Sequence, residues 1–469
     1  MNKKLVSLMT LGASTLPLVL ASASCNVEKS GENVSKEQGL INQLSQLSKE
    51  EKAKLIDALD LKKVLSEEEK AKLVEKVHNQ AGLFGAVVWY IKSVENHISR
   101  KQSFVLAKAA FDNLMKKGNS QNIEYGKNYN TIQKVENAGE GKSVPVVFMD
   151  IDETVLANDY IEGLSVYEKG FFHEGTKVDF DVKGLRREIP GAIDFINYIQ
   201  SKGAVVMFNS NMPQGKKVVE GTIENLKALG LKFIEPWQFW MRGSLPYQPT
   251  SETASVLKSL RENVNRDKES VSSIKFDQTK YAAQPWLTFE NWENAKALGK
   301  SVLKNTRMDA VSENQETGWN LKLADNKSGE AVKFKVIMKI GDNYNDFFDN
   351  IAPETNDERV AQYKNNPALK ALFTNINGAK GQKATYDKTT KKVTFKELEW
   401  DQFYVQTPGN AEYGDWSKEY GYGAFTKIAK ALEEITKDSK WQEKPTEKSI
   451  DKSIETDEAT NNGTVSPSA

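Results

Sequence analysis

The stretch Val144-Pro145-Val146-Val147-Phe148-Met149-Asp150-Ile151-Asp152-Glu153-Thr154 decides the fold of this chain of 469 residues. Its first six residues form a short, continuous apolar run, which is typical of a strand buried on both faces of a sheet. Two aspartates follow at once, and in an open parallel sheet ligands bind beyond the carboxyl ends of the strands. The sequence therefore predicts a buried strand over 144–149 whose end presents Asp150 and Asp152.

The segments around this strand alternate between strand and helix patterns, which indicates βαβ units and a parallel sheet flanked by helices. A strongly helical segment over 82–117, rich in large apolar residues, is expected to form one or two helices that pack on the main domain. The other expected elements are helices over 191–201 and 216–229, strands over 204–208, 232–234 and 336–340, and a hairpin over 383–396. The predicted class is α/β with an N-terminal helical segment.

The composition divides the chain into parts. Residues 81–436 form the predicted main domain, and the polar composition around 236–300 indicates a long insertion within it. Residues 25–80 read as a polar leader with two similar segments, from Leu47 and from Leu65, which fit either a helical spacer or ordinary surface helices. Apolar residues nearly vanish over 437–469, so a disordered tail is expected there.

The first 24 residues have the pattern of a secretory signal. A charged start is followed by an apolar run from Leu5 to Leu20 and by small residues just before Cys25. Because Cys25 is the only cysteine, this segment resembles a bacterial lipoprotein signal with Cys25 as the acylated residue. The alternative is a plain signal with an incidental cysteine. The expected location is the outward face of a bacterial cell membrane, with a lipid anchor.

The charge balance excludes some classes of function. The chain has 64 basic and 64 acidic residues, so a basic footprint for a nucleic acid polymer is absent. It has one cysteine and three histidines, which is too few for a cysteine- or histidine-based metal centre. Any metal chemistry must therefore come from carboxylates.

A second acidic segment, Gly341-Asp342-Asn343-Tyr344-Asn345-Asp346, ends the predicted strand over 336–340. If the two strands are adjacent, Asp150 and Asp342 become neighbours, and their like charges need a cation or a proton between them. Two aspartates two positions apart in a turn can place one carboxylate and one backbone carbonyl on a single cation, which suits Mg²⁺, since it prefers oxygen ligands and keeps several waters. The alternative for the first motif alone is an acidic turn that caps a helix.

Phe208-Asn209-Ser210-Asn211 closes the strand over 204–208. It offers a hydroxyl and backbone N–H groups to an anion, although a serine at such a place is more often a turn residue.

Taken together, these motifs resemble the haloacid dehalogenase (HAD) superfamily and, within it, the class C acid phosphatases, a family of bacterial lipoprotein phosphatases and 5′-nucleotidases. The resemblance extends from about Gly82 to about Leu432. It departs from the family at Ala157, where an acidic residue is usual, and in the long segment after Ser210. The matching stretches are Asp150–Leu156, Ile189–Ala192, Gly221–Ile223, Gly341–Asn343, Ala86–Tyr90 and Asn410–Trp416.

The resemblance implies a role for each candidate residue. Asp150 would be the nucleophile that forms an aspartyl-phosphate, and Asp152 the general acid and base. Mg²⁺ would bind Asp150, Asp152 and Asp342, and Asp346 would orient the phosphate-binding lysine. That lysine resembles Lys304, with Lys300 or another neighbour as the alternative. The phosphate would contact Ser210, Asn211 and Lys304.

The implied substrate is a nucleoside monophosphate or another phosphomonoester. Tyr413 is the preferred residue for stacking on a base, because it lies in a stretch that resembles the family's C-terminal aromatic motif. The competing hypothesis is a catalytically inert surface lipoprotein that uses a HAD-like fold as a binding or adhesion module. The sequence leaves open whether the chain forms a homodimer. Other candidates for stacking are Tyr160, Phe172 and Trp416, while His173 is expected to be structural.

Overall fold

The computed structural model describes residues 88–118, 135–138, 141–169, 174–246, 278–299, 302–321, 331–387, 389–390, 392–409 and 437. The elements named below all lie in a compact unit, residues 1–423; in a second unit, 424–469, only Lys437 is described. The predicted signal, the two similar segments, Cys25, Tyr413 and most of the predicted tail lie outside the described residues. Among the described helices, none is both long enough and apolar enough to cross a membrane.

A five-stranded sheet in the order β2-β1-β3-β5-β4 forms the centre of the fold. β1 (Val144–Met149) pairs in parallel with β2 (Val205–Phe208) and with β3 (Phe334–Gly341). β5 (Lys392–Gln406) adds in parallel to β3, and β4 (Ala379–Asp387) completes the sheet as an antiparallel edge. All six residues of β1 are buried, as the apolar run predicts for a central strand. The predicted α/β class is confirmed.

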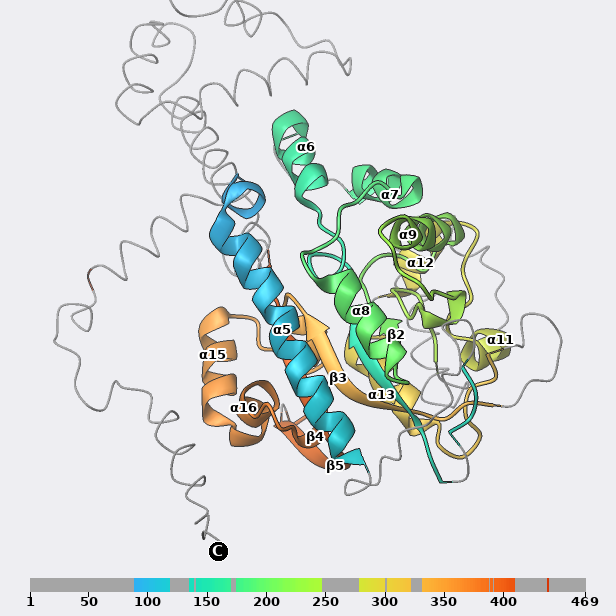
Figure 1. Ribbon diagram of the computed structural model, residues 1–469, viewed down its shortest axis with the longest axis vertical. Helices are drawn as coiled ribbons and strands as arrows, with labels where there is room; N and C mark the ends of the chain where they lie inside the picture. Colours follow the sequence, from blue (N-terminus) through green and yellow to red (C-terminus); the bar gives the residue numbers. More distant parts are fainter. Residues whose placement is uncertain are drawn as a thin grey trace, which may run out of the picture. The chain divides into compact units, whose positions relative to one another are not determined.

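Helices cover both faces of the sheet (Figure 1). On one face, α5 (Val94–Lys116) and α8 (Ala192–Ser201) lie side by side, with the rings of Phe104 and Phe195 5.7 Å apart. α9 (Lys216–Ala228) adds Val218 and Leu226 to the same core. The other face packs against α13 (Lys304–Glu313) and a group of aromatic side chains, Trp237, Trp240, Trp286 and Trp319.

The predicted N-terminal helical segment is an integral part of the domain. Ser93 caps α5 by accepting a hydrogen bond from the backbone N–H of Asn96, and Phe104 and Phe111 are buried against the sheet. Trp89 and Leu106 lie on the outer side and are about half exposed. Helical residues 88–92 precede α5, with a break at Ser93.

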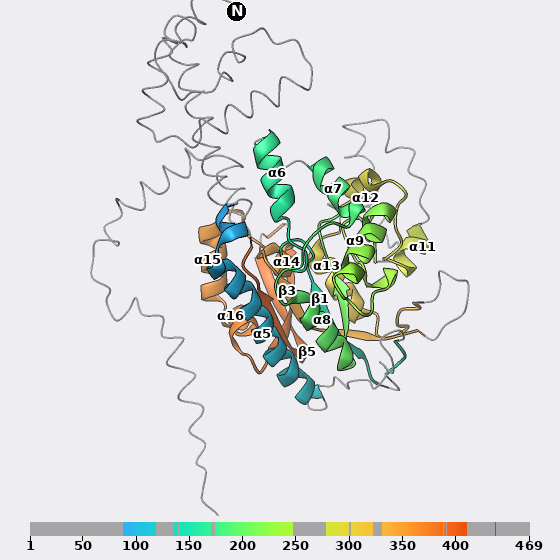
Figure 2. The same cartoon turned by 45° about the horizontal axis from the view of Figure 1, so that its top comes forward.

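Two helices that the sequence did not predict, α6 (Asp159–Lys169) and α7 (Glu174–Lys183), follow the Asp150–Thr154 segment. They lie beyond the end of the sheet toward which the β3 arrow points (Figure 1), and the turned view keeps them there (Figure 2). α7 packs closely on α9 at Gly221, where a Cβ atom would overlap the carbonyl oxygens of Asp181 and Val182. Only glycine allows this approach of the two helices.

The structure corrects one predicted element and extends another. The predicted strand over 232–234 is wrong. Phe233 is buried, but its carbonyl oxygen accepts a hydrogen bond from the Gln200 side chain, so apolar burial occurs there without strand pairing. The predicted hairpin is confirmed, and β5 continues past it into the main sheet.

The remaining elements flank the sheet. Around the predicted insertion, Trp237 and Trp286 lie in the core, while 247–277 fall outside the described residues. The short elements of this region are η4 (Pro236–Gln238), α11 (Gln278–Ala283) and α12 (Trp292–Gly299). Before the hairpin come α14 (Asn345–Phe348), α15 (Asn356–Asn365) and α16 (Pro367–Thr374).

Candidate active site

The carboxyl ends of three adjacent parallel strands bring the predicted residues to one edge of the sheet. Asp150 follows β1, Ser210 lies just after β2, and Asp342 follows β3. The hydrogen bonding between β1 and β3 continues to Asp150, since the backbone N–H of Asp150 donates to the carbonyl oxygen of Ile340 at 2.9 Å. Strand adjacency, which the sequence reasoning assumed, is therefore what gathers the site.

Lys304 is the first residue of α13, and its side chain reaches into this edge. Its Nζ lies 2.6 Å from Asp150 Oδ1 and 2.6 Å from Asp346 Oδ1. Asp349 fixes the start of the helix, because its carboxylate accepts hydrogen bonds from the backbone N–H groups of Lys304 and Asn305. The alternative lysine, Lys300, lies outside the described residues.

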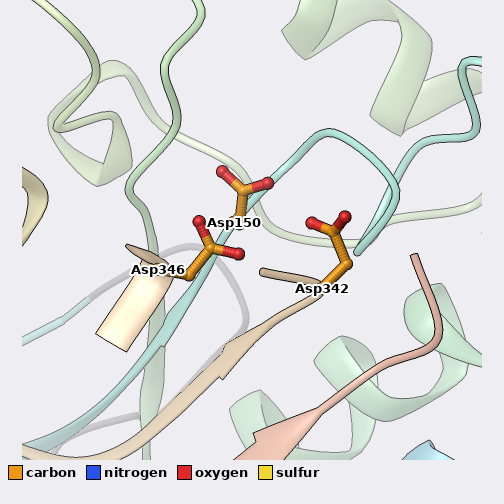
Figure 3. A group of neighbouring side chains, drawn as sticks. All are labelled: Asp150, Asp342 and Asp346. Atoms are coloured by element: carbon orange, nitrogen blue, oxygen red, sulfur yellow. The ribbon is translucent and has the colours of Figure 1, made fainter. Parts of the chain in front are cut away.

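Asp150, Asp342 and Asp346 form an acidic cluster. One carboxylate oxygen of each lies within 4.8 Å of the others, and the three side chains surround a common space (Figure 3). Gly341 makes the tight geometry feasible, because a Cβ atom there would overlap the Asp346 carboxylate. The resemblance implied that Asp346 orients the phosphate-binding lysine. In the structure Asp346 contacts Lys304, and it also lies close enough to Asp150 and Asp342 to share a cation with them.

The charges of this cluster fit a divalent cation. Three carboxylates and the Lys304 ammonium leave two negative charges uncompensated, and the described residues donate no hydrogen bond to the Asp342 carboxylate. Burial and the neighbouring charges of Asp346 and Asp152 raise the pKa of Asp150 to about 7, although Lys304 opposes the rise. Burial, then Asp346 and Asp150, raise the pKa of Asp342 well above its usual range. A cation bound here would relieve this repulsion.

Asp152 has a different environment. Its Oδ1 lies 2.9 Å from Lys177 Nζ and 2.7 Å from Arg186 Nη2. Burial disfavours the charge, but these two cations outweigh it and hold the pKa of Asp152 below its usual range. The carboxylate of Asp152 is therefore paired with two cations and is not one of the three that form the acidic cluster.

Ser210 lies two residues after the end of β2 and contacts Asp152. It is fully buried, its hydroxyl donates to Asp152 Oδ2 at 3.3 Å, and the backbone N–H of Met212 donates to that hydroxyl. Arg307, three residues after Lys304 on α13, donates to the carbonyl oxygen of Ser210 and to Asn209 Oδ1. α13 thus holds both the lysine and the loop after β2.

Glu153 anchors the loop that carries the two aspartates. It is fully buried, and it is the one non-glycine residue in the described part of the chain with a positive φ (60°). Its carboxylate accepts a hydrogen bond from the backbone N–H of Asn158 and pairs at 3.5 Å with Arg100 on α5. The N-terminal helix therefore directly supports the loop that carries Asp150 and Asp152.

A cavity of about 460 Å³ opens at this edge. Tyr160 is not among the residues that line it; its ring is 60% exposed and packs on Phe180. The other stacking candidates and His173 lie outside the described residues. The predicted residues that line the cavity are Asp150, Asp152, Asn211, Lys304, Asp342 and Asp346.

Sequence reasoning missed Lys177, Asp181, Arg186 and Glu153. The spacing of Lys177 and Asp181 (i, i+4) indicates a helical ion pair, but nothing in the sequence places that pair beside Asp152. Glu153 lies inside the motif that decides the fold, yet its role depends on contact with Arg100, which is 53 residues away.

Comparisons with known proteins found one family model and solved structures that are similar to this chain. Residues 107–268 match the model of the HAD superfamily, subfamily IIIB (acid phosphatase). Two solved structures of the class C acid phosphatase from Bacillus anthracis, one with tungstate bound, are similar to this chain, each with a TM-score of 0.42. They are 17% and 18% identical to it, over 76% of this chain and 97% of theirs.

The family match contains Asp150, Asp152 and Ser210 but ends before Lys304 and Asp342. The structure brings those two residues to Asp150, since Lys304 contacts its carboxylate and Asp342 belongs to the same acidic cluster. Residues 107–268 of this chain are therefore similar to the acid phosphatases of the HAD superfamily, subfamily IIIB.

Proposed function

We propose that this protein is a Mg²⁺-dependent acid phosphatase that hydrolyses phosphomonoesters through an aspartyl-phosphate on Asp150. The observation that carries the proposal is the position of Asp150, which lies buried at the end of the central strand, in contact with Lys304 and within reach of Asp342 and Asp346. Such a carboxylate can face a phosphate only when cations offset the charge of both groups.

The reaction would proceed in two displacements. In the first, an Asp150 carboxylate oxygen forms a bond to phosphorus, the ester P–O bond breaks, and the leaving oxygen takes a proton from Asp152. In the second, the oxygen of a water molecule bonds to the same phosphorus and the water gives a proton to Asp152. The bond between phosphorus and the Asp150 oxygen breaks, so phosphate leaves and the Asp150 carboxylate is restored. Ser210 and Lys304 would hold the phosphoryl oxygens, where negative charge develops.

The metal would be held by Asp150, Asp342 and Asp346, with the Asp152 carbonyl as a further oxygen ligand. This all-oxygen set, with room for waters, suits Mg²⁺. When bound, the ion neutralises charge on the phosphate as the nucleophile approaches.

The substrates proposed are nucleoside monophosphates and related phosphomonoesters. A cavity of about 460 Å³ beside Asp150 is of the size that holds a small ligand. We further propose that Cys25 carries a lipid that anchors the protein to the outer face of the cell membrane. The pattern of residues 1–25 supports the anchor.

An assay of the purified protein tests the proposal. We expect release of phosphate from p-nitrophenyl phosphate and from nucleoside monophosphates, loss of activity with EDTA, and recovery when Mg²⁺ is restored. The variant Asp150→Asn is the matched control for a contaminating phosphatase, because it changes one carboxylate oxygen and should be inactive. A wild-type protein without activity at any pH between 4 and 8 would instead favour the inert binding module. Activity on aryl but not nucleoside phosphates would reject the nucleotidase part alone.

A further inference from the structure

Four charged side chains form a closed ring beside the cavity: Asp152, Lys177, Asp181 and Arg186. Lys177 Nζ lies 2.9 Å from Asp152 Oδ1 and 2.8 Å from Asp181 Oδ2. Arg186 bridges the same two carboxylates, at 2.7 Å from Asp152 Oδ1 and 2.8 Å from Asp181 Oδ1. The ring balances two positive and two negative charges, and its least buried member, Asp152, has a side chain that is 19% exposed.

The ring is attached firmly to the core. Lys177 and Asp181 lie one turn apart on α7, which rests on α9 at Gly221. Asn225 on α9 holds the backbone of Arg186 from both sides, since its Oδ1 accepts from the Arg186 N–H and its Nδ2 donates to the Arg186 carbonyl oxygen. The two cations therefore have little freedom to follow Asp152 if it moves; they determine where it lies.

The ring also decides which oxygen of Asp152 takes part in chemistry. Both cations contact Oδ1, so this oxygen is occupied and the plane of the carboxylate is fixed. Among the described residues, the one hydrogen bond to Oδ2 comes from the Ser210 hydroxyl, at a long 3.3 Å. Oδ2 is the oxygen that remains available to exchange a proton with a substrate.

We propose that Lys177 and Arg186 are positioning residues that orient Asp152 Oδ2 for proton transfer to the leaving oxygen, and that Asp181 holds both cations in place. The inference rests on the role of Asp152 in the proposed function. A misplacement of about 1 Å at a reacting group can cost about 100-fold in rate. α7 then determines how well the enzyme handles substrates whose leaving oxygen needs a proton.

The test compares two leaving groups. The p-nitrophenolate ion leaves with little protonation, whereas the alkoxide of β-glycerophosphate needs a proton. Lys177→Met should lower kcat/KM about 10- to 100-fold more for β-glycerophosphate than for p-nitrophenyl phosphate. Two exposed cations serve as matched controls: Lys183→Met on the same helix and Arg187→Met next to Arg186. In each control, the ratio of kcat/KM for β-glycerophosphate to kcat/KM for p-nitrophenyl phosphate should stay unchanged.

A second variant separates positioning from stability. Lys177→Met leaves Asp181 with one cation fewer, so we expect a lower melting temperature. The double variant Lys177→Met/Asp181→Asn removes one charge of each sign and should recover the melting temperature. The positioning role predicts that the double variant keeps the selective defect on β-glycerophosphate. If the single variant does not fold, the double variant takes its place in the comparison of the two substrates.

Two results would overturn the inference: equal losses on both substrates, or recovery of both activities in the double variant. A wild-type protein inactive on both esters would reject the proposed function itself. An active wild type with a loss that does not depend on the leaving group would reject only this role of the ring.

Discussion

At the scale of single residues, the site assigns opposite environments to two aspartates that are two positions apart. Asp150 lies among carboxylates, and its pKa is raised to about 7 by burial and by its neighbours. Asp152 lies between two cations, and its pKa is lowered despite burial. A cation bound beside Asp150 would oppose the rise in its pKa and favour the ionised carboxylate, the form in which it can act as a nucleophile.

The two environments predict different effects of removing Asp152. Asp152→Asn keeps the nucleophile but removes the acid, so the loss in kcat/KM should depend on the leaving group. We expect a loss of about 10²–10⁴-fold for a nucleoside monophosphate and a much smaller loss for p-nitrophenyl phosphate. Steady-state kinetics with both substrates measures this, and equal losses would remove Asp152 from the role of acid.

Asp342 offers a test of the metal site that does not depend on the nucleophile. Asp342→Asn removes an anionic ligand, so the apparent affinity for Mg²⁺ should fall about 10- to 100-fold, with partial rescue at high Mg²⁺. The rise in melting temperature on adding Mg²⁺ should shrink in parallel, which gives a readout besides activity. Asp357→Asn, an exposed aspartate at the start of α15, is the control. Unchanged Mg²⁺ dependence in the Asp342 variant would place the ion elsewhere.

At the scale of elements, the strands that end in the site could be predicted and the helices that complete it could not. Residues 144–149 are apolar without interruption because both faces of β1 are buried, and that pattern is readable. α6 and α7 have mixed polar sequences and lie beyond the sheet; in α7 only Lys177, Val178 and Asp181 are buried. Their contribution is made by charged contacts, which leave no periodic signal.

The contact between α7 and α9 gives an element-scale prediction. Alanine normally stabilises a helix interior by about 1 kcal/mol relative to glycine. At Gly221 the added Cβ would lie 2.5 Å from the carbonyl oxygen of Val182 and even closer to that of Asp181, so overpacking should outweigh this gain. We expect Gly221→Ala to lower the free energy of unfolding by about 1–3 kcal/mol in urea titrations. Glu220→Ala, an exposed neighbour on α9, should have little effect, and a stabilised Gly221 variant would contradict the close contact.

At the scale of the whole molecule, residues distant in sequence build one site. Lys304 lies 154 positions after Asp150, and Arg100 supports Glu153 from the N-terminal helix. The family resemblance indicated Lys304 as the phosphate-binding lysine, but only the structure shows its contact with Asp150. The strand pairing of β5 with β3 was missed because one long strand serves both the predicted hairpin and the main sheet.

The position of the protein in the cell is a separate prediction at this scale. If Cys25 is acylated, Cys25→Ser should move the protein from the membrane fraction to the soluble fraction, because the variant lacks the residue that carries the acyl chains on which stable anchoring depends. The activity per molecule should be unchanged. Fractionation of cells followed by the phosphatase assay measures both properties. A wild-type protein found in the soluble fraction would reject the anchor and leave the enzyme assignment intact.

The central claim is that Asp150 becomes covalently phosphorylated. The most direct measurement is an acid quench during turnover of p-nitrophenyl phosphate, followed by peptide mass spectrometry of the segment that contains Asp150. The account predicts a peptide that gains the mass of one phosphoryl group on Asp150, accumulates further in Asp152→Asn because hydrolysis then lacks its base, and is absent in Asp150→Asn. An active enzyme whose Asp150 peptide stays unmodified in the wild type and in Asp152→Asn, or a phosphoryl group found on another residue, would contradict it.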